Sequence, residues 1–455
     1  MSFRSRLCVL LLAAAAIFSF GAASGQVANP PAAKPPAAKP PAAAKVSDVI
    51  AGIPVNYDES KVGTYTLPDP LVMLDGKTVK DAKTWTNKRR PEILKLAEEN
   101  EYGRTPGRPK DMSFEVFDKG TPAFNGTAIR RQITIYFSKD KNGPKEDLVL
   151  YLPAGAKKPV PVLLNISFSP NASSIQDPEI RLGEMWGRGG TRVPQTRGRG
   201  MGGGLRVEAI LARGYGVASV YYGDIDPDFL GGVKLGVRSI FLKPGQTDPA
   251  PDEWGAISAW AWGLSRCLDY LETDKGVDAK KVAITGVSRL GKTVLWAGAH
   301  DARFGMVIAS CGGEGGAALS RRNYGETIAH LVAPSRYPYQ FCANYAKYAQ
   351  DPNKLPIDSH MLIALMAPRP ILLQTGSTDN WSDPKGEFLA AVAAEPVFRL
   401  FGKQGLGLTT DQMPAAGQPV LHTIGYLMHQ GGHGMVPTDW DTYLNFMDMH
   451  FQPGK

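Results

Sequence analysis

The stretch KVAITGVSRLGKTVLWAGA, residues Lys281–Ala299, decides the fold, because it predicts a buried strand, a sharp turn and a helix in direct succession. Within it, GVSRLGKT matches the phosphate-binding loop G-x-x-x-x-G-K-[ST]. The same residues begin with Gly286-x-Ser288, the start of a nucleophile elbow, in which a strand–turn–helix lifts a serine hydroxyl clear of a sheet. The first motif indicates a nucleotide-binding protein and the second a serine esterase, and the residue types at the other positions of the stretch distinguish the two.

The context favours the nucleophile elbow. A phosphate-binding loop wraps phosphates with the backbone N–H groups of a glycine-rich turn, and none of the four variable positions here is glycine. The match to the elbow is also imperfect, because Leu290 stands where the second glycine is usual and Gly291 comes one residue later. We therefore expect a reactive serine at Ser288 and search for its partners.

The rest of the chain alternates apolar runs with longer helical patterns, which predicts a mostly parallel sheet covered by helices on both faces. No second linker of domain-separating length interrupts residues 46–455, so we expect one α/β catalytic domain. The expected strands are Ala128–Ser138, Glu146–Pro153, Val160–Phe168, Gly216–Tyr222, Lys281–Gly286, Gly305–Ser310 and Arg369–Gly376, and the expected helices include Thr84–Pro106, Ala256–Leu271 and Pro437–His450.

The N-terminus has the three-part plan of a signal peptide. Arg4 and Arg6 precede an apolar run, Leu7–Phe20, and small residues follow up to Gly25. That run is too short to span a membrane. A linker rich in Pro, Ala and Lys, residues 26–45, comes next. We therefore expect a secreted or periplasmic protein with no membrane contact after the signal is cleaved.

Composition adds little about chemistry. The formal net charge of +8 favours acidic partners but carries no information about the fold. Three cysteines, Cys267, Cys311 and Cys342, remain after signal cleavage, and the sequence leaves their disulfide state open.

A serine nucleophile needs a base, and among the seven histidines His433 fits best, with His429 as the alternative. His433 lies in a glycine-flanked loop after an expected strand and before the last helix, where such enzymes carry their base. The two histidines are four residues apart, but Gly431 and Gly432 lie between them and argue against a helix. We therefore expect no metal site there.

The base needs a carboxylate to orient it. Asp379 follows an expected strand and is the better candidate, because Asp383 precedes Pro384 and suits a helix N-cap.

Several stretches resemble carbohydrate esterase family 15, the glucuronoyl esterases. GVSRLGK resembles the G-x-S-R-x-G-K elbow of that family, which explains the displaced glycine. GGAALSRRNYGE (315–326), DNWSDPKGEF (379–388) and GGHGM (431–435) are similar to its bacterial branch, in the same order. The resemblance covers roughly residues 84–451. It implies an α/β-hydrolase fold, a three-layer sandwich with a mostly parallel central sheet.

The resemblance also implies roles. Ser288 matches the nucleophile, His433 the base, and Arg289 a residue that helps hold the oxyanion. Three further residues, Lys292, Glu326 and Trp381, match residues that contact the glucuronoyl sugar. Their structural alternatives are a solvated charge for Lys292, a pairing of Glu326 with Arg321 or Arg322, and a core position for Trp381.

One departure from the family leaves the acid open. Many members place a glutamate in an E-S-G-x-G-G stretch, where this chain reads SCGGEGG (310–316), with Cys311 at that position and Glu314 three residues later. Other members use an aspartate after the later strand, which Asp379 matches. We therefore assign the acid to Asp379, with Glu314 as the alternative.

The expected function is a serine esterase that cleaves glucuronic acid esters of aromatic, lignin-like alcohols on glucuronoxylan, with no metal or other cofactor. The arginine- and glycine-rich loop 187–204 would suit such an acidic polysaccharide. We expect no nucleic-acid partner and a monomer. Two alternatives remain, another carbohydrate esterase such as an acetyl xylan esterase, and a non-catalytic polysaccharide-binding relative.

Overall fold

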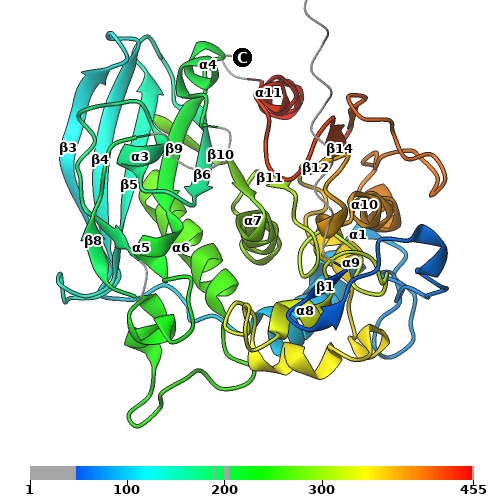
Figure 1. Ribbon diagram of the computed structural model, residues 1–455. Helices are drawn as coiled ribbons and strands as arrows, with labels where there is room; N and C mark the ends of the chain where they lie inside the picture. The colour runs from blue at the N-terminus through cyan, green and yellow to red at the C-terminus, as the bar shows by residue number, and fades with distance from the viewer. Residues whose placement is uncertain (1–47, 188–189, 199–203, 453–455) are drawn as a thin grey trace, which may run out of the picture. The chain divides into compact units, whose positions relative to one another are not determined.

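The computed structural model describes residues 48–187, 190–198 and 204–452 (Figure 1). The expected signal peptide and linker lie outside these residues. Ten strands form one sheet in the order β13-β14-β12-β11-β10-β6-β9-β5-β4-β3. Their bounds are β3 Ser113–Ala123, β4 Ala128–Tyr136, β5 Lys145–Pro153, β6 Val160–Ser167, β9 Gly216–Tyr221, β10 Val277–Val287, β11 Met306–Ser310, β12 Ile371–Gly376, β13 Val420–Leu421 and β14 Ile424–His429.

The centre of the sheet is parallel and its two ends are antiparallel. Strands β14, β12, β11, β10, β6 and β9 pair in parallel, whereas β13 at one end and β5, β4 and β3 at the other pair antiparallel. The connections 124–127 and 137–144 are too short for the crossover that a parallel pair needs. The predicted parallel sheet therefore holds where helices connect the strands.

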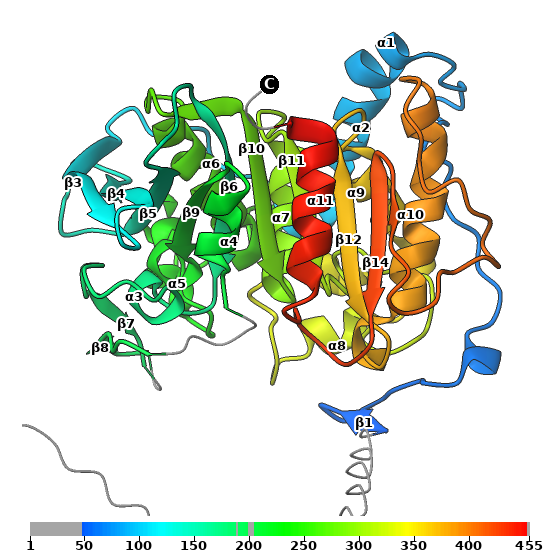
Figure 2. The same ribbon diagram turned by 90° about the horizontal axis from the view of Figure 1, so that it is seen from above.

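Helices cover both faces of the sheet, as expected from the nearly continuous apolar runs (Figure 2). The longer helices are α2 Arg90–Ala97, α4 Val207–Ala212, α6 Ala256–Leu271, α7 Arg289–His300, α9 Ser359–Ala364, α10 Pro384–Arg399 and α11 Asp439–Phe451. Alternate side chains of a strand point to opposite faces of the sheet. Leu163 and Ala283 therefore pack in one core with α4 and α11, whereas Leu164 and Ile284 pack in the other with α6, α7, α9 and α10.

Short elements complete the described residues. The helix expected at 84–106 is present and ends at Tyr102, with a π-helical segment, Trp85–Arg89, before α2 and another, Glu98–Tyr102, after it. Its C-cap, Gly103, has a φ of 84°, in the left-handed region. None of the described helices combines the length and apolar character needed to cross a membrane. The short elements are β1 Val49–Ile50, β2 Ile53–Pro54, α1 Ala82–Thr84, α3 Asn171–Ser174, β7 Glu184–Trp186, β8 Arg192–Pro194, α5 Tyr222–Ile225 and α8 Ile328–Val332.

Candidate active site

A cavity of about 420 Å³ opens at the carboxyl ends of the parallel strands. Ser288, Arg289 and His433 all line it. Open α/β sheets bind their ligands at this end of the strands. A larger cavity of about 860 Å³ lies at the opposite ends, beside the first residues of β6 and β10, but its described lining has no Ser, Cys or His. The smaller cavity is therefore the candidate active site.

Ser288 occupies a strained turn between β10 and α7. Its φ of 61° and ψ of −128° are unfavourable for a residue with a side chain. Its N–H donates to the Ser310 carbonyl at 2.8 Å, and its carbonyl accepts from the Lys292 N–H at 3.0 Å. The strain is thus held by hydrogen bonds to the neighbouring strand and to the following helix, as the nucleophile elbow predicts.

The two glycines around Ser288 permit close contacts of the backbone. A Cβ atom on Gly286 would lie 2.5 Å from the carbonyl oxygen of Leu290, and one on Gly291 would collide with the carbonyl oxygen of Ser310. Leu290 itself is fully buried. The glycine is therefore needed at 291 and not at 290, because residue 291 is the one that faces β11.

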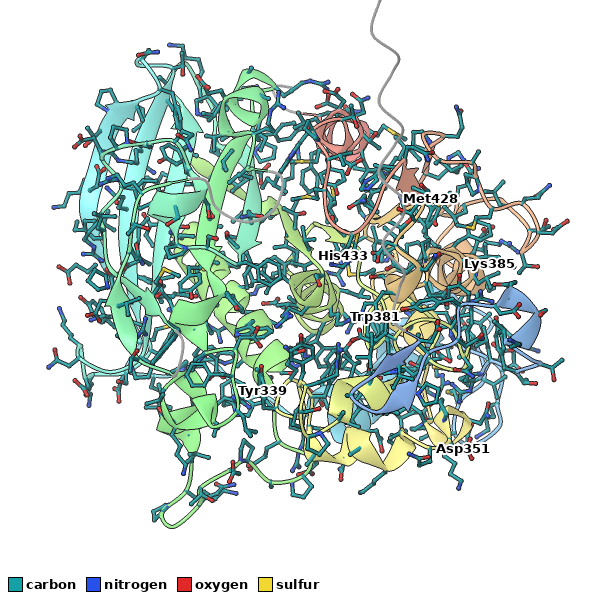
Figure 3. All side chains as sticks on the ribbon, in the orientation of Figure 1. Tyr339, Asp351, Trp381, Lys385, Met428 and His433 are labelled. Carbon is teal, nitrogen blue, oxygen red and sulfur yellow. The ribbon has the colours of Figure 1, made fainter. Side chains whose placement is uncertain are left out.

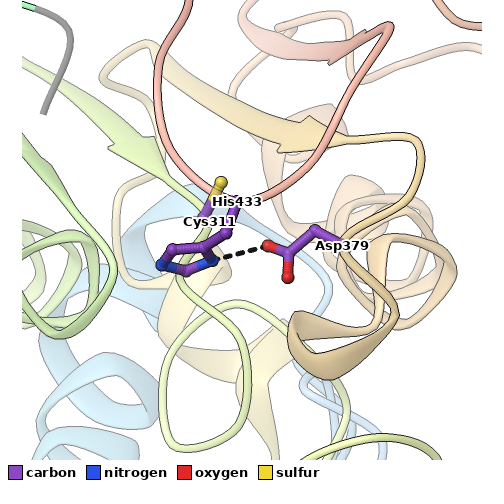
Figure 4. Close-up of side chains that lie close together, drawn as sticks. All are labelled: Cys311, Asp379 and His433. Atoms are coloured by element: carbon purple, nitrogen blue, oxygen red, sulfur yellow. Dashed lines mark hydrogen bonds and ion pairs between the residues drawn. The ribbon is translucent and has the colours of Figure 1, made fainter. Parts of the chain in front are cut away.

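His433 and Asp379 form a hydrogen-bonded pair (Figure 4). The His433 Nδ1 atom lies 2.7 Å from an oxygen of Asp379. The histidine side chain is 42% exposed and the aspartate side chain 4%. Burial raises the pKa of Asp379, but hydrogen bonds from His433 and Ser382 outweigh it, so the pKa lies below its usual value. The carboxylate is therefore ionised at neutral pH and orients the imidazole.

Arg289 follows Ser288, and its guanidinium is held in place. It forms an ion pair with Asp228 and lies over the ring of Tyr337, 4.6 Å from the ring centroid. Tyr339 and Gln340 each donate to the other oxygen of Asp228 at 2.9 Å. Asp228 could not be found from the sequence, since no motif singles it out among the three aspartates of GDIDPD.

Comparison with known proteins decides the family. A family model described as glucuronyl esterase of fungi matches residues 249–402. Carbohydrate esterase MZ0003, from an unknown prokaryotic organism, is 46% identical over 406 residues, which cover 88% of this chain and 93% of that protein. The chain belongs to carbohydrate esterase family 15, the glucuronoyl esterases. The family resemblance read from the sequence is confirmed.

Solved structures agree with this assignment. A glucuronoyl esterase from Solibacter usitatus is 49% identical, covers 86% of this chain and 100% of its own, and superposes with a TM-score of 0.82. An esterase of the same family from a marine bacterial metagenome, described as promiscuous, is 46% identical over 87% of this chain and 100% of its own, with a TM-score of 0.80. The predicted α/β-hydrolase fold and the carboxylic ester hydrolase class are thereby confirmed.

In this glucuronoyl esterase, the residues matched to sugar contacts lie together. Lys292 is 5% exposed, and its Nζ atom lies 3.5 Å from Glu326. Glu326 also accepts from Arg336 at 2.8 Å, and the Arg336 guanidinium lies 5.1 Å from the ring centroid of Trp381. Figure 3 labels Trp381 and His433, and His433 lines the cavity together with Ser288, the residue that precedes α7.

The structure shows other contacts for these residues than the structural alternatives named from the sequence. Lys292 is buried and not solvated. Glu326 pairs with Lys292 and Arg336. The two arginines considered as its partners from the sequence, Arg321 and Arg322, pair instead with other carboxylates: Arg321 with Asp358, and Arg322 with Asp383 and Glu59. Trp381 is half-buried, and its ring packs against that of His330, with the ring centroids 5.2 Å apart. Arg336 was missed in the sequence, since it lies in a loop without a motif.

Glu314, the alternative acid, is engaged elsewhere. It accepts hydrogen bonds from Ser320 at 2.6 Å and from Tyr345 at 2.8 Å. Complete burial raises the pKa of Glu314 to about 8, so the carboxyl group is mostly neutral at pH 7. Among the described residues, the carboxylate that contacts His433 belongs to Asp379 and not to Glu314.

The raised pKa of Glu314 predicts a pH-dependent stability. The folded state binds this proton more tightly than the unfolded state, so Glu314 lowers the free energy of unfolding as the pH rises from about 4.5 to about 8. Glu314→Gln removes this titration. As the pH rises from about 5 to about 8, we expect the free energy of unfolding of the variant to increase by a few kcal/mol relative to that of the parent, at about 1.4 kcal/mol per pKa unit. Urea unfolding of the parent and the variant at about pH 5 and about pH 8 checks this. An equal difference in the free energy of unfolding at the two pH values would contradict it.

The remaining candidates have structural contacts. His429 is buried, and its ring atoms contact Asp439 at 2.9 Å and the Gly432 carbonyl at 3.0 Å. Asp383 caps α10, as expected, by accepting from the Gly386 N–H at 3.0 Å. The three cysteines in the described part of the chain, Cys267, Cys311 and Cys342, are buried free thiols.

Proposed function

We propose that this esterase hydrolyses esters between (4-O-methyl-)glucuronic acid on xylan and aromatic, lignin-like alcohols. Hydrolysis of glucuronic acid esters is the activity of its family, and curated relatives named 4-O-methyl-glucuronoyl methylesterase include a protein of Phanerochaete carnosa that is 25% identical over 77% of this chain. The observation that carries the proposal is the position of the hydrogen-bonded His433–Asp379 pair at the same cavity as the Ser288 elbow.

The proposed reaction is an acyl transfer through Ser288. The Nδ1–H of His433 donates to Asp379, which leaves Nε2 to take the serine proton. The alkoxide attacks the uronate carbonyl, and the oxyanion is held by Arg289 and by a backbone N–H near Phe168, which lines the cavity. His433 then protonates the departing alcohol, and water hydrolyses the acyl-enzyme. An alcohol leaves more readily than an amine, which suits an esterase.

Selectivity for a uronate is proposed to depend on Lys292. Among the described residues, the buried ammonium group of Lys292 contacts Glu326 alone, at 3.5 Å, so it retains donors for the oxygens of a sugar or its carboxyl group. An acetyl ester offers no such uronate carboxyl group. Arg336 holds the other oxygen of Glu326, so the glutamate keeps a cationic partner when Lys292 is replaced.

Lys292→Met is therefore expected to distinguish the substrates. We expect a fall in kcat/KM for benzyl glucuronate of about 10–100-fold, the effect of about 1.5–3 kcal/mol that hydrogen bonds to charged groups contribute. Hydrolysis of acetylated xylan, if measurable in the parent, should change by less than about twofold. Steady-state kinetics on both esters checks this.

Lys280→Met, at an exposed position in β10, is the matched control and should leave both rates unchanged. An equal loss on both esters in Lys292→Met would contradict the uronate-binding role. A parent that prefers acetylated xylan would instead favour the acetyl xylan esterase alternative.

We also propose that the protein is exported, as a secreted or periplasmic monomer. Residues 1–25 support export through their paired arginines, short apolar run and small residues. The net charge of +8 favours approach to an acidic glucuronoxylan.

A further inference from the structure

Cys311 brings a third type of metal-binding side chain to the His433–Asp379 pair. One potential ligand atom from each of Cys311, Asp379 and His433 lies within 4.8 Å of the other two. Figure 4 shows the three side chains together, with the imidazole of His433 joined to the carboxylate of Asp379 by a dashed line and the sulfur of Cys311 near the histidine side chain. The proposed hydrolysis uses the imidazole and the carboxylate, and it assigns no role to the thiol.

Three adjacent strands hold these residues in place. Cys311 follows β11, Asp379 comes shortly after β12, and His433 lies in the loop after β14, and these strands pair in parallel. Cys311 has a left-handed φ of 48°, and its Sγ atom accepts from the Gly434 N–H at 3.3 Å. The thiol is therefore directed at the loop that carries the imidazole. Strained residues of this kind persist only where their surroundings hold them.

The three donors match the preferences of zinc. Thiolate, imidazole and carboxylate are its usual ligands, with bonds of about 2.0–2.3 Å. Two of them carry a negative charge when bound, which neutralises a divalent cation, and a coordinating thiol loses its proton to the metal. Bonds of this length place the ligands of a tetrahedral site about 3.3–3.8 Å apart, so the loop has to move by about 1 Å.

The loop can make that adjustment. Gly431, with a φ of 140°, and Gly434, with a φ of 112°, flank His433 in conformations that glycine adopts readily. The His433 side chain is 42% exposed, so a cation can approach from the cavity. Three protein ligands leave the fourth position to water.

We propose that Cys311, Asp379 and His433 form a binding site for a thiophilic divalent cation such as Zn²⁺, and that its occupation inhibits hydrolysis. The inhibition rests on the proposed function, because the cation engages the proposed base and its acid. The binding itself does not depend on the function. The cation plays no part in the reaction and competes with it.

Binding is tested by calorimetric titration of the untagged chain with ZnCl₂, and by the absorption of Co²⁺ bound in its place. We expect one Zn²⁺ per chain and a thiolate-to-cobalt charge-transfer band. Cys311→Ser should remove the band and weaken Zn²⁺ binding by at least about 100-fold, because loss of even an outer-shell partner costs about 10–100-fold. Cys342→Ser, at another buried thiol, is the matched control and should keep the charge-transfer band and the affinity for Zn²⁺. Absence of the band in the parent, or equal Zn²⁺ affinity in Cys311→Ser, would overturn the site.

Inhibition is tested separately by measuring each variant relative to its own metal-free rate on benzyl glucuronate. We expect Zn²⁺ to inhibit the parent and Cys342→Ser at concentrations that leave Cys311→Ser active. Should Cys311→Ser fail to show a cooperative unfolding transition, Asp379→Asn keeps the thiol and should still weaken Zn²⁺ binding by at least about tenfold. A parent that binds Co²⁺ through the thiol but hydrolyses no uronate ester would refute the proposed function and leave the site standing. A parent that hydrolyses the ester and binds no Zn²⁺ would refute the site alone.

Discussion

Ser288→Ala is expected to lower kcat for benzyl glucuronate by about 10⁶-fold, the scale of loss when the nucleophile of a serine hydrolase is removed. The hydroxyl sits in a strained turn at the cavity that His433 lines, and alanine leaves no group there to attack the carbonyl. The variant should keep its affinity for glucuronoxylan, since the residues proposed to contact the sugar remain. Single-turnover and steady-state hydrolysis, with binding measured by calorimetry, check this expectation.

Ser382→Ala is the matched control for Ser288→Ala. Its hydroxyl lies 3.2 Å from His433 Nδ1, the nitrogen that faces Asp379, and not at the elbow. We expect it to lower kcat by about tenfold at most, the effect of about one neutral hydrogen bond. Comparable losses in the two variants would refute the assignment of Ser288. A parent that binds glucuronoxylan but hydrolyses no uronate ester would favour the non-catalytic alternative.

Much of the fold could be predicted because it depends on local patterns. The helix expected at Ala256–Leu271 has those same bounds, and the apolar runs at Val160 and Gly216 form buried central strands. The strand β3, Ser113–Ala123, was not predicted, since Gly120 and Pro122 in its second half are typical of turns and edge strands. Its pairing depends on β4, which a local pattern does not report.

The residues of the candidate site also differ in how far the sequence predicts them. Ser288 and His433 could be found because each lies in a distinctive glycine-flanked motif. Asp228 and Arg336 could not, since no motif marks either residue. Asp228 reaches Arg289 from a loop 61 residues earlier in the chain, and Arg336 folds back onto Glu326 from the loop after the short helix α8. Such contacts arise only when the chain has folded.

Asp379→Asn is expected to lower kcat by about 10⁴-fold, the effect of the same change in a serine protease triad. An amide in place of the carboxylate no longer requires a proton on His433 Nδ1, so the imidazole adopts the wrong tautomer, and the imidazolium formed during attack loses its counter-charge. Hydrolysis of benzyl glucuronate measured across pH would show a lower rate throughout, which distinguishes this loss from a shifted pH optimum.

Glu314→Gln tests the alternative acid with the same type of substitution. Glu314 is mostly neutral at pH 7, because burial raises its pKa to about 8, and glutamine can still accept from Ser320 and Tyr345. We therefore expect less than about a threefold change in kcat, against the loss of about 10⁴-fold in Asp379→Asn. The reverse order of effects would show that the loop rearranges in the working enzyme to bring Glu314 to the base.

The position of Cys311 permits a stricter test of the Asp379 assignment. A carboxylate placed there comes from β11, the strand next to the one that positions Asp379, and the Cys311 thiol already lies within 4.8 Å of potential ligand atoms of both Asp379 and His433. Adding Cys311→Glu to Asp379→Asn should therefore recover part of the lost rate, by about tenfold or more. Recovery would show that His433 needs a carboxylate near Nδ1 and does not depend on the strand that supplies it. If Asp379→Asn is fully inactive and Cys311→Glu restores nothing while the double variant remains folded, Asp379 must do more than orient the imidazole.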